Sequence, residues 1–534
     1  MAISPASTQS AVGTNARIMA KFSQPLDPTT VTAATFSVTS GFATVSGTRT
    51  VAASERGPNT LVTFTPTAPL PANSSIVVAI TSGMKNSLGE PLLVTALSSA
   101  TFSTGPGPDL TAPSLGALNP PNGVLSVGTN NVITAEFSEP INATSVTTST
   151  FAVTAGGIPV NGRVKVIAGP RGVNTQAVFT PDQLLGSTVT YAVSIGTGIT
   201  DTAGNPLVAP FNSSFGTGVG IDNFQPSLLS VSPQSGAIGV PLNARVTVRF
   251  SEPVNPQTVH AGTFGVMGLT GTITMAPDSL SATWTPTQAF LPNTDYSVLV
   301  QSNGTDVIRD LAGNALLSPP LSVGLGSFKT GSGPIDMTGP QVVIVSPADV
   351  ATAVPINSQV LLRFSEPIAA PTVHGQTVTV AAGGVPIPGT MTLERANTVV
   401  RWKLPVLTQF APNTVYTVTV TTGVTDQVGN PIAATFTSTF TTGSAADTTA
   451  PTITSVTPAS GATNVSRGTQ VAVTLSEAIN PATVVVGNIN VDGTFSLSSF
   501  GVITGIVQGT AAVSEDRKTI TFTPTFPLLA NQLV

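Results

Sequence analysis

The chain has 534 residues, several times the roughly 100 to 150 of most single domains, so we expect several hydrophobic cores. Only 8% of the residues are charged, and the 19 Lys and Arg residues form no basic cluster, which excludes a nucleic-acid partner. Cysteine is absent, and this excludes disulfides, zinc–thiolate sites and thiol catalysis.

The composition favours strands and turns. The chain contains 50 Gly and 45 Pro, and 41% of its residues are hydrophobic. β-Branched side chains suit a pleated surface, whereas Gly and Pro favour turns. Every apolar run is shorter than the about 18 residues that span a bilayer, so we expect no transmembrane segment in this chain. The sequence therefore predicts an all-β, multidomain protein.

One short motif, Phe-Ser-Glu-Pro or a close variant, occurs five times. Its copies are Phe22-Ser23-Gln24-Pro25, Phe137-Ser138-Glu139-Pro140, Phe250-Ser251-Glu252-Pro253, Phe364-Ser365-Glu366-Pro367 and Leu475-Ser476-Glu477-Ala478. Their first residues lie 115, 113, 114 and 111 positions apart. A unit of this length can hold its own core, so the period indicates tandem domains and not a solenoid.

Further landmarks follow the motif in the same order in each unit. A strand ends in an aromatic residue, Thr and Pro in four of the five units. The next alternating strand begins at Ile76, Tyr191, Tyr296 or Tyr416, and three of the units then carry an Asp-x-x-Gly-Asn loop. Short strands of period two, with turn residues about every 8 to 12 positions, predict a two-sheet Greek-key sandwich for each unit.

Asp-containing linkers that end in Pro separate the units. They predict five domains, at residues 1–108, 109–221, 222–335, 336–446 and 447–534. The fifth unit stops at residues 530–534, where the strand equivalent to the one at Tyr416 would begin, so we expect domain 5 to lack its last strands. Two explanations stay open: the sequence is a fragment of a longer array, or a neighbouring subunit supplies the missing strands.

This order of motifs resembles the bacterial Ig-like domains found in S-layer proteins, adhesins and other exported multidomain proteins. The resemblance covers essentially the whole chain. It implies a tandem array of Ig-like Greek-key β-sandwich domains with an extracellular or cell-surface location. The same module also occurs as a spacer in secreted enzymes and as a phage decoration, so the resemblance leaves the biological role open.

Acidic residues recur at the domain boundaries. In an Ig-type sandwich the second and the penultimate strand both run toward the N-terminal pole, so the motif and the Asp-x-x-Gly-Asn loop should meet there beside the incoming linker. Oxygen ligands from separate segments suit Ca²⁺. The candidate ligands are Asp109, Glu139 and Asp201; Asp222, Glu252 and Asp310; Asp336, Glu366 and Asp426; and Asp447 and Glu477.

The first unit differs, because it has Gln24 and Asn86 where the later units have Glu and Asp. The alternative interpretation of all these residues is local: Asp and Asn cap turns through hydrogen bonds to the backbone, and the Glu is a solvated turn residue. The three tyrosines share one position in the repeat, which predicts a core ring whose hydroxyl is bonded to the backbone, as in the tyrosine corner of Ig-type sandwiches.

The chain carries no motif of a hydrolase elbow, a phosphate-binding loop or a zinc protease. We therefore expect a non-enzymatic structural or adhesive protein that forms an extended stalk, coat or filament, through self-association or extracellular partners. No cofactor is required, and calcium is the one we consider. The alternative function is a spacer, or carbohydrate- or protein-binding modules, of a larger secreted enzyme or a phage surface protein.

Overall fold

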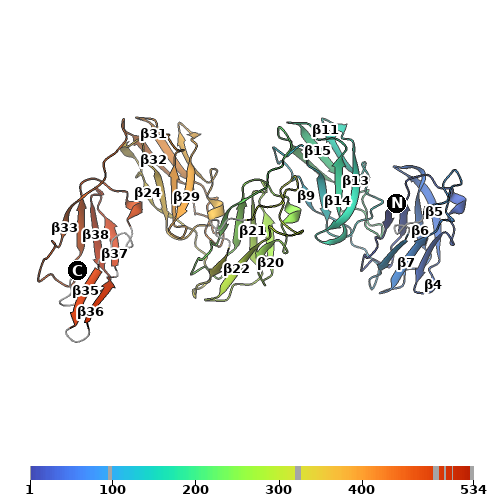
Figure 1. Cartoon of the computed structure of the whole chain (residues 1–534), viewed down its shortest axis with the longest axis horizontal. Helices are drawn as coiled ribbons and strands as arrows, with labels where there is room; N and C mark the ends of the chain where they lie inside the picture. The colour runs from blue at the N-terminus through green and yellow to red at the C-terminus, as the bar shows by residue number, and fades with distance from the viewer. Residues whose placement is uncertain are drawn as a thin grey trace. The chain divides into compact units, whose positions relative to one another are not determined.

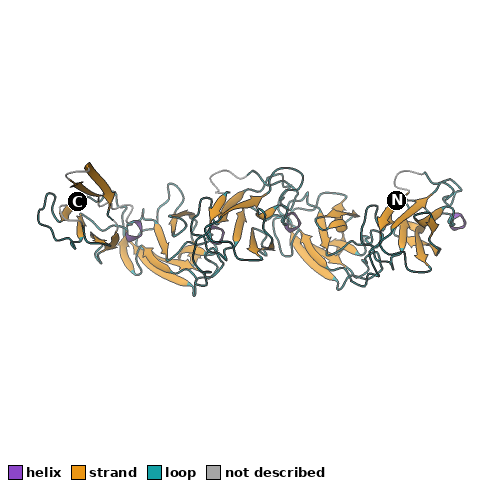
Figure 2. Cartoon of the chain, turned by 90° about the horizontal axis from the view of Figure 1, so that it is seen from below, coloured by secondary structure: helices purple, strands orange, loops and turns teal. Residues whose placement is uncertain are grey.

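The computed structural model describes residues 2–93, 99–318, 326–484, 492–497, 501–507 and 509–528. Each repeat forms its own group of strands (Figure 1), and the helices are single turns of three residues (Figure 2). None of the helices in the described part of the chain is long and apolar enough to cross a membrane. The contacts divide the chain into two compact units, one with repeats 1 and 2 and part of repeat 3, the other with the remainder.

The first two repeats have the same strand order. Repeat 1 contains β1 (Ala2–Ser4), β2 (Ile18–Lys21), η1 (Pro28–Thr30), β3 (Phe36–Ser40), β4 (Ala43–Thr44), β5 (Gly47–Ser54), β6 (Gly57–Pro66), β7 (Ser75–Ile80) and β8 (Ser99–Ser103). Repeat 2 contains β9 (Leu115–Asn119), β10 (Ile133–Phe137), β11 (Phe151–Ala155), β12 (Ile158–Pro159), β13 (Gly162–Gly169), β14 (Gly172–Pro181), β15 (Thr190–Ile195) and β16 (Phe211–Gly216).

Repeats 3 to 5 keep one four-stranded sheet of this order, whereas the second sheet has three strands in repeat 3, five in repeat 4 and, among the described residues, two in repeat 5. Repeat 3 contains β17 (Leu228–Ser232), β18 (Val246–Phe250), η3 (Pro256–Thr258), β19 (Phe264–Val266), β20 (Gly271–Met275), β21 (Ser281–Pro286), β22 (Asp295–Val300) and β23 (Ser327–Lys329). Repeat 4 contains β24 (Val342–Ser346), β25 (Ala351–Val354), β26 (Val360–Phe364), η5 (Ala370–Thr372), β27 (Val378–Ala382), β28 (Val385–Pro386), β29 (Thr390–Glu394), β30 (Val399–Lys403), β31 (Val415–Val420) and β32 (Phe436–Thr442). Repeat 5 contains β33 (Ile453–Thr457), β34 (Val471–Leu475), η6 (Pro481–Thr483), β35 (Asp492–Leu497), β36 (Gly501–Ile506), β37 (Gly509–Val513) and β38 (Thr519–Pro524).

Two facing sheets make up the sandwich of repeat 1. One has the order β1-β2-β6-β5 and the other β4-β3-β7-β8. Repeat 2 repeats this arrangement as β9-β10-β14-β13 and β12-β11-β15-β16. Because the chain passes from one sheet to the other between the second and third strands, the order is that of an Ig-type Greek key. The predicted fold class is confirmed. The predicted end of domain 5, at residues 530–534, lies outside the described residues.

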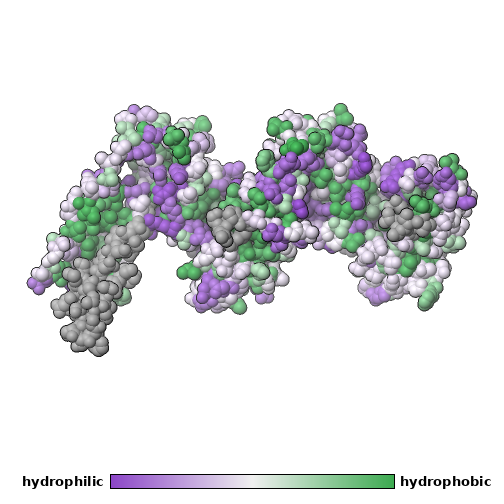
Figure 3. Space-filling view, in the orientation of Figure 1, coloured by the Kyte–Doolittle hydropathy of each residue, from purple (hydrophilic) through white to green (hydrophobic). Residues whose placement is uncertain are grey.

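The cores of repeats 1 to 4 are apolar and aromatic. The motif phenylalanines of repeats 1 to 4, Phe22, Phe137, Phe250 and Phe364, are all buried. In repeat 1, β2 pairs with β6 in a register that sets Ile18 opposite Phe64, and both side chains face the core. The visible surface mixes hydrophilic and hydrophobic residues (Figure 3).

A glycine next to a core aromatic recurs at the start of the fifth strand. A Cβ added to Gly162 would lie 2.5 Å from an edge carbon of Phe179, and one added to Gly47 would lie 2.4 Å from Phe64. No real side chain tolerates such a contact, so the glycine makes room for the ring. This pairing between neighbouring strands ties the aromatic-Thr-Pro motif to the glycine that faces it.

The tyrosine corner predicted from the sequence is confirmed. The hydroxyl of Tyr191 accepts a hydrogen bond of 2.6 Å from the backbone N–H of Gly186. Tyr416 accepts one of 2.9 Å from Ala411, and its ring stacks on Phe440 with the ring centroids 5.4 Å apart. Each ring therefore packs in the core while its hydroxyl holds the loop that precedes the strand.

The substitution Tyr416→Phe tests this corner. It keeps the ring but leaves the N–H of Ala411 without its partner, which should destabilise this loop by about 1 kcal/mol. We expect faster hydrogen exchange at the amide of Ala411, with exchange in repeat 2 unchanged because its own corner is intact. Unaltered exchange at Ala411 would show that the hydroxyl contributes no stability.

Candidate cation sites at the repeat boundaries

Three acidic clusters lie at the predicted boundaries. We name them cluster A (Asp109, Glu139, Asp201), cluster B (Asp222, Glu252, Asp310) and cluster C (Asp336, Glu366, Asp426). In each cluster the three residues offer one carboxylate oxygen apiece, and these oxygens lie within 4.8 Å of one another. The structure thus brings together the nine residues that the sequence grouped in threes.

The strands of the sandwich account for this convergence. In repeat 2 the motif glutamate follows β10, and the Asp-x-x-Gly-Asn loop follows β15. An isolated antiparallel bridge joins Ile141, just beyond the motif, to Asp201. Equivalent bridges join Val254 to Asp310 and Ile368 to Asp426, so the same backbone contact builds all three clusters.

The loop aspartate is bound mainly by its own loop. Asp201 is 1% exposed, and its Oδ1 accepts hydrogen bonds from the backbone N–H groups of Gly204 (2.7 Å) and Asn205 (2.8 Å). Its Oδ2 accepts one from the side chain of Asn205 at 2.7 Å. These bonds agree with the turn-capping interpretation of the loop. A carboxylate oxygen has two lone pairs, so Oδ2 keeps the capacity for one more partner.

The linker aspartate also caps a turn. Oδ1 of Asp109 accepts hydrogen bonds from the backbone N–H and the hydroxyl of Thr111, at 3.0 and 2.8 Å. The loop asparagine reaches the same segment, because Nδ2 of Asn205 donates to the carbonyls of Asp109 (3.1 Å) and Thr111 (2.9 Å). Linker and loop are therefore held together without any ion.

An asparagine of the preceding repeat forms two hydrogen bonds with the backbone of each linker aspartate. Nδ2 of Asn130 donates to the carbonyl of Asp222 and Oδ1 of Asn130 accepts from its N–H, both at 2.9 Å. The same two-point contact is made by four asparagines on four linkers: Asn15 on Asp109, Asn130 on Asp222, Asn243 on Asp336 and Asn357 on Asp447. We call this contact the asparagine clamp.

Sequence reasoning missed the asparagine clamp. Its signal was present, because Asn15, Asn130, Asn243 and Asn357 each stand seven positions before the first residue of a motif. The equivalent position in repeat 5 is Gly468. Spacing alone gives the position of such a residue but not its partner, which belongs to the next repeat.

The loop also contacts the preceding repeat directly. The residue after each loop aspartate accepts a hydrogen bond through its carbonyl: Thr202 from the N–H of Arg17 at 3.2 Å, and Gln427 from the N–H of Arg245 at 2.9 Å. The carbonyl of Leu311 accepts one from the side chain of Asn119 at 3.1 Å. Each cluster therefore adjoins a contact between consecutive repeats.

Burial and mutual repulsion raise the pKa values of the cluster glutamates. Burial first, and then the charges of Asp109 and Asp201, raise the pKa of Glu139 to about 7. Burial and two neighbouring aspartates likewise raise the pKa of Glu252 to about 7 and that of Glu366 to about 7. Like charges this close favour the neutral acid unless a cation offsets them.

Burial and hydrogen bonds shift the pKa values of two loop aspartates in opposite directions. Burial raises the pKa of Asp201, and the hydrogen bonds from Asn205 and Gly204 partly offset that rise. Burial raises the pKa of Asp310 in the same way, opposed by the bonds from Asn314. The hydrogen bonds thus favour the ionised form of these two groups against the effect of burial.

The first and fifth repeats differ from the three clusters. In repeat 1, Nδ2 of Asn86 donates to Oε1 of Gln24 (3.3 Å) and to Oε2 of Glu90 (2.8 Å). The side-chain amides of Asn86 and Gln24 therefore pair at the position where the later repeats have two carboxylates. In repeat 5, the hydroxyl of Thr449 lies 2.6 Å from Oδ1 of Asp447 and 3.4 Å from Oε2 of Glu477. Within the described residues these two carboxylates gain no third acidic partner.

Comparison with protein families identifies the repeats. The family model described as "Bacterial Ig-like domain" matches residues 1–104, 109–217, 222–330, 336–442 and 447–533. The chain belongs to the bacterial Ig-like domain family. These bacterial Ig-like domains follow one another over almost the whole sequence, and the resemblance inferred from the motifs is confirmed.

Similar proteins include surface proteins of bacteria. An S-layer protein of Geobacillus stearothermophilus is 27% identical over 500 residues, which is 81% of this chain and 39% of the relative. The chain thus spans well under half the length of that relative. The N-terminal part of the bacterial S-layer protein SbsC is 17% identical over 39% of this chain and 45% of the solved one, with a TM-score of 0.16.

An L,D-transpeptidase from Mycobacterium tuberculosis is also similar to these Ig-like domains. It is 21% identical over 31% of this chain and 63% of the solved one, with a TM-score of 0.14. Both TM-scores are too low for either likeness to bear on the function of this chain.

The raised pKa values predict a pH dependence in metal-free buffer. A glutamate with a pKa of about 7 in the folded protein and an ordinary value near 4.5 when unfolded binds more protons in the native state between these values. The free energy of unfolding should therefore fall as pH rises through this window and level off above it. We expect the thermal midpoint to fall between about pH 5 and about pH 8.

The triple variant Glu139→Gln, Glu252→Gln, Glu366→Gln is the control for this pH series. It removes the three titrating groups and copies the glutamine found naturally at position 24. The midpoint of the variant should vary less with pH across the window. Equal slopes in the variant and the unaltered chain would contradict the assignment.

The asparagine clamp can be tested with Asn130→Ala. Two hydrogen bonds to the backbone of Asp222 are lost, each with a net value of about 1 kcal/mol. We expect faster hydrogen exchange at the amide of Asp222, measured in the full chain. The exposed linker residue Asn223 provides the matched control, Asn223→Ala, which should leave that exchange unchanged. The clamp has no role if both variants behave alike.

Proposed function

We propose that this chain is a structural segment of a cell-surface protein, in which Ig-like repeats form an extracellular stalk, coat or filament. The observation that carries the proposal is the run of five bacterial Ig-like domains along the chain. The similarity to an S-layer protein over 81% of the chain adds support for a surface location and for self-association. An adhesive role is the narrower form of the same proposal.

The build of the repeats supports a mechanical role. Repeats 1, 2 and 4 each have a large buried apolar cluster, and the cluster of repeat 2 also includes Leu311 of repeat 3. The asparagine clamp then joins consecutive repeats by paired hydrogen bonds at four linkers. Separate cores joined by defined contacts suit a structural protein such as a stalk or filament. We also propose that the chain has no catalytic activity.

Electron microscopy tests this function. Gold-labelled antibodies raised against the purified chain should bind to the surface of intact, unpermeabilised cells of the source organism. The native surface material should show a regular coat or fibres that carry the label. Label confined to the cytoplasm of sectioned cells would overturn the proposal. An enzymatic activity of the labelled material that depends on residues of this chain would overturn it as well.

We further propose that clusters A, B and C bind a calcium ion each. Calcium takes oxygen ligands at 2.3–2.6 Å, so two oxygens on one ion lie at most about 5 Å apart. The carboxylate oxygens of each cluster lie within 4.8 Å of one another and come from three separate segments. The raised pKa values of Glu139, Glu252 and Glu366 support a site that lacks positive charge.

Thermal melting in calcium and in chelator tests the metal. An ion that binds only the folded chain stabilises it by about 2.7 kcal/mol per site at a hundredfold excess over its dissociation constant. We expect a higher midpoint in calcium at neutral pH, and the triple glutamine variant should lose this rise. The variant Gln24→Ala in repeat 1 should keep it, because that repeat has no acidic cluster. An identical midpoint in calcium and chelator would end the hypothesis while leaving the structural role untouched.

A further inference from the structure

A short helical turn follows the motif at the same position in several repeats. In repeat 3 this turn is η3, and Asn255 caps it by accepting a hydrogen bond of 3.0 Å from the backbone N–H of Gln257. In repeat 1 the turn is η1, and Asp27 caps it by accepting one of 3.0 Å from Thr29. Gln257 and Thr29 therefore occupy equivalent positions. Thr29 is exposed, whereas Gln257 is 3% exposed.

Gln257 is buried against the outer face of a sheet of repeat 2. Its Nε2 donates to the carbonyls of Thr134 (2.7 Å) and Ala117 (3.3 Å). Its Oε1 accepts from the hydroxyl of Thr134 at 2.7 Å and from the side-chain amide of Gln176. These three partners lie on the adjacent strands β9, β10 and β14. A side-chain amide offers two donors and two acceptor positions, and in Gln257 all four are used.

A second contact joins the same pair of repeats. Leu311, which follows the loop aspartate of repeat 3, is 7% exposed and belongs to the apolar core cluster of repeat 2. The buried side chain of Asn119 donates to the carbonyl of Leu311. Gln257 and Leu311 also fall in the same compact unit as repeat 2. Repeat 3 thus contributes one buried polar and one buried apolar residue to its neighbour.

A longer loop distinguishes repeat 3 from repeats 1, 2 and 4. Ten positions separate Val300 from Asp310, whereas six separate Ile195 from Asp201 in repeat 2. Asp306, in this loop, lies 3.1 Å from Nε2 of His260. The pair borders a cleft of about 520 Å³ whose walls come from both repeats. The joint between repeats 2 and 3 therefore carries features that the repeat period does not supply.

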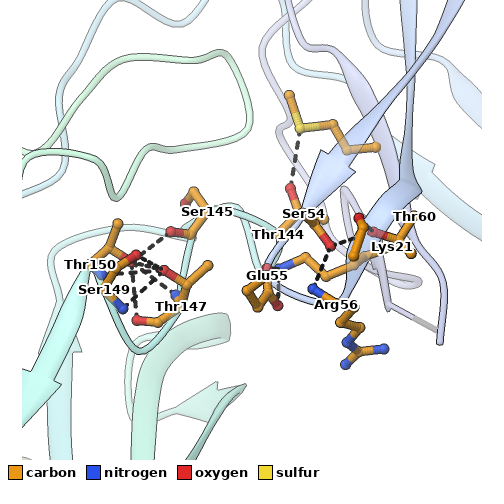
Figure 4. Close-up of polar contacts among 12 residues, drawn as sticks. Lys21, Ser54, Glu55, Arg56, Thr60, Thr144, Ser145, Thr147, Ser149 and Thr150 are labelled. Atoms are coloured by element: carbon orange, nitrogen blue, oxygen red, sulfur yellow. Dashed lines mark hydrogen bonds and ion pairs between the residues drawn. The ribbon is translucent and has the colours of Figure 1, made fainter. Parts of the chain in front are cut away.

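The joint between repeats 1 and 2 has a weaker contact at this position, and the joint between repeats 4 and 5 has a different one. Between repeats 1 and 2, the hydroxyl of Thr144 (Figure 4) and the amide of Asn142 point at the sulfur of Met19, at 3.2 and 3.1 Å. A thioether is a weak acceptor. Between repeats 4 and 5, Nη2 of Arg395 donates to the carbonyl of Thr483 at 3.0 Å.

We infer that Gln257 locks repeats 2 and 3 into one rigid pair, stiffer than the joint between repeats 1 and 2. A buried amide with every position paired holds one orientation, because any rotation or withdrawal leaves several polar groups unpaired in the interior. The inference goes beyond the proposed function. It does not depend on the role of the chain at the cell surface, or on whether the acidic clusters bind calcium.

Distance measurements between spin labels test the lock in the full chain. The sequence has no cysteine, so two introduced cysteines take the labels without further changes. Lys165→Cys on β13 and Thr272→Cys on β20 are exposed positions that report on repeats 2 and 3. Thr50→Cys on β5, paired with Lys165→Cys, reports on repeats 1 and 2. All measurements are made in chelator, so that bound metal plays no part.

We expect a narrower distance distribution for repeats 2 and 3 than for repeats 1 and 2. Gln257→Ala should widen the distribution for repeats 2 and 3 to that of the other joint. Thr134→Val, which changes the partner while keeping its shape, should widen it as well and guards against a folding defect in the first variant. The matched control Thr29→Ala should leave it unchanged. Equal widths at the two joints in the unaltered chain would overturn the lock, as would no widening in either variant.

Discussion

The linker aspartate is contacted by two consecutive repeats at once. The asparagine clamp bonds the backbone of Asp222 to repeat 2, while the carboxylate of Asp222 lies in cluster B with two residues of repeat 3. Loop and linker are further tied by Asn314, which donates to the carbonyl of Asp222. A charge change in the cluster therefore acts on a residue whose backbone is already fixed to the preceding repeat.

The carboxylates of each acidic cluster repel one another, and hydrogen bonds within the loop offset part of the unfavourable energy. Hydrogen bonds from the loop favour the ionised aspartates, whereas the cluster glutamates are left with pKa values of about 7. Either a proton or a cation relieves the repulsion. Repeat 1 avoids it altogether, because Gln24 and Asn86 pair through amides. The contrast within one chain indicates that the acidic version is not needed for the fold itself.

Much of the fold could be predicted because five copies of one pattern reinforce each other. The period located the strands, and the shared position of Tyr191 and Tyr416 predicted a hydroxyl bonded to the backbone, which the structure confirms. The meeting of Glu139 with Asp201 followed from the direction of two strands in an Ig-type sandwich. Each of these features depends only on contacts within a repeat.

Contacts between repeats could not be predicted in this way. The asparagine clamp has a regular spacing, but its partner is a backbone that no side-chain pattern reveals. The other repeats have different residues at the position of Gln257, so a comparison of the repeats does not single it out. Its role follows only from its contacts with β10 in the structure. For Asp447 and Glu477 the sequence proposed two ligands without a third, and the described structure adds none.

The most direct test of the central claim is the number of calcium ions that the chain binds. The chain is dialysed to equilibrium against calcium, and its metal content is measured per molecule, beside the triple variant Glu139→Gln, Glu252→Gln, Glu366→Gln. Clusters A, B and C predict three specifically bound ions per chain, and the loss of all three in the variant. Equal metal content in the two proteins would contradict the assignment of the three clusters as calcium sites.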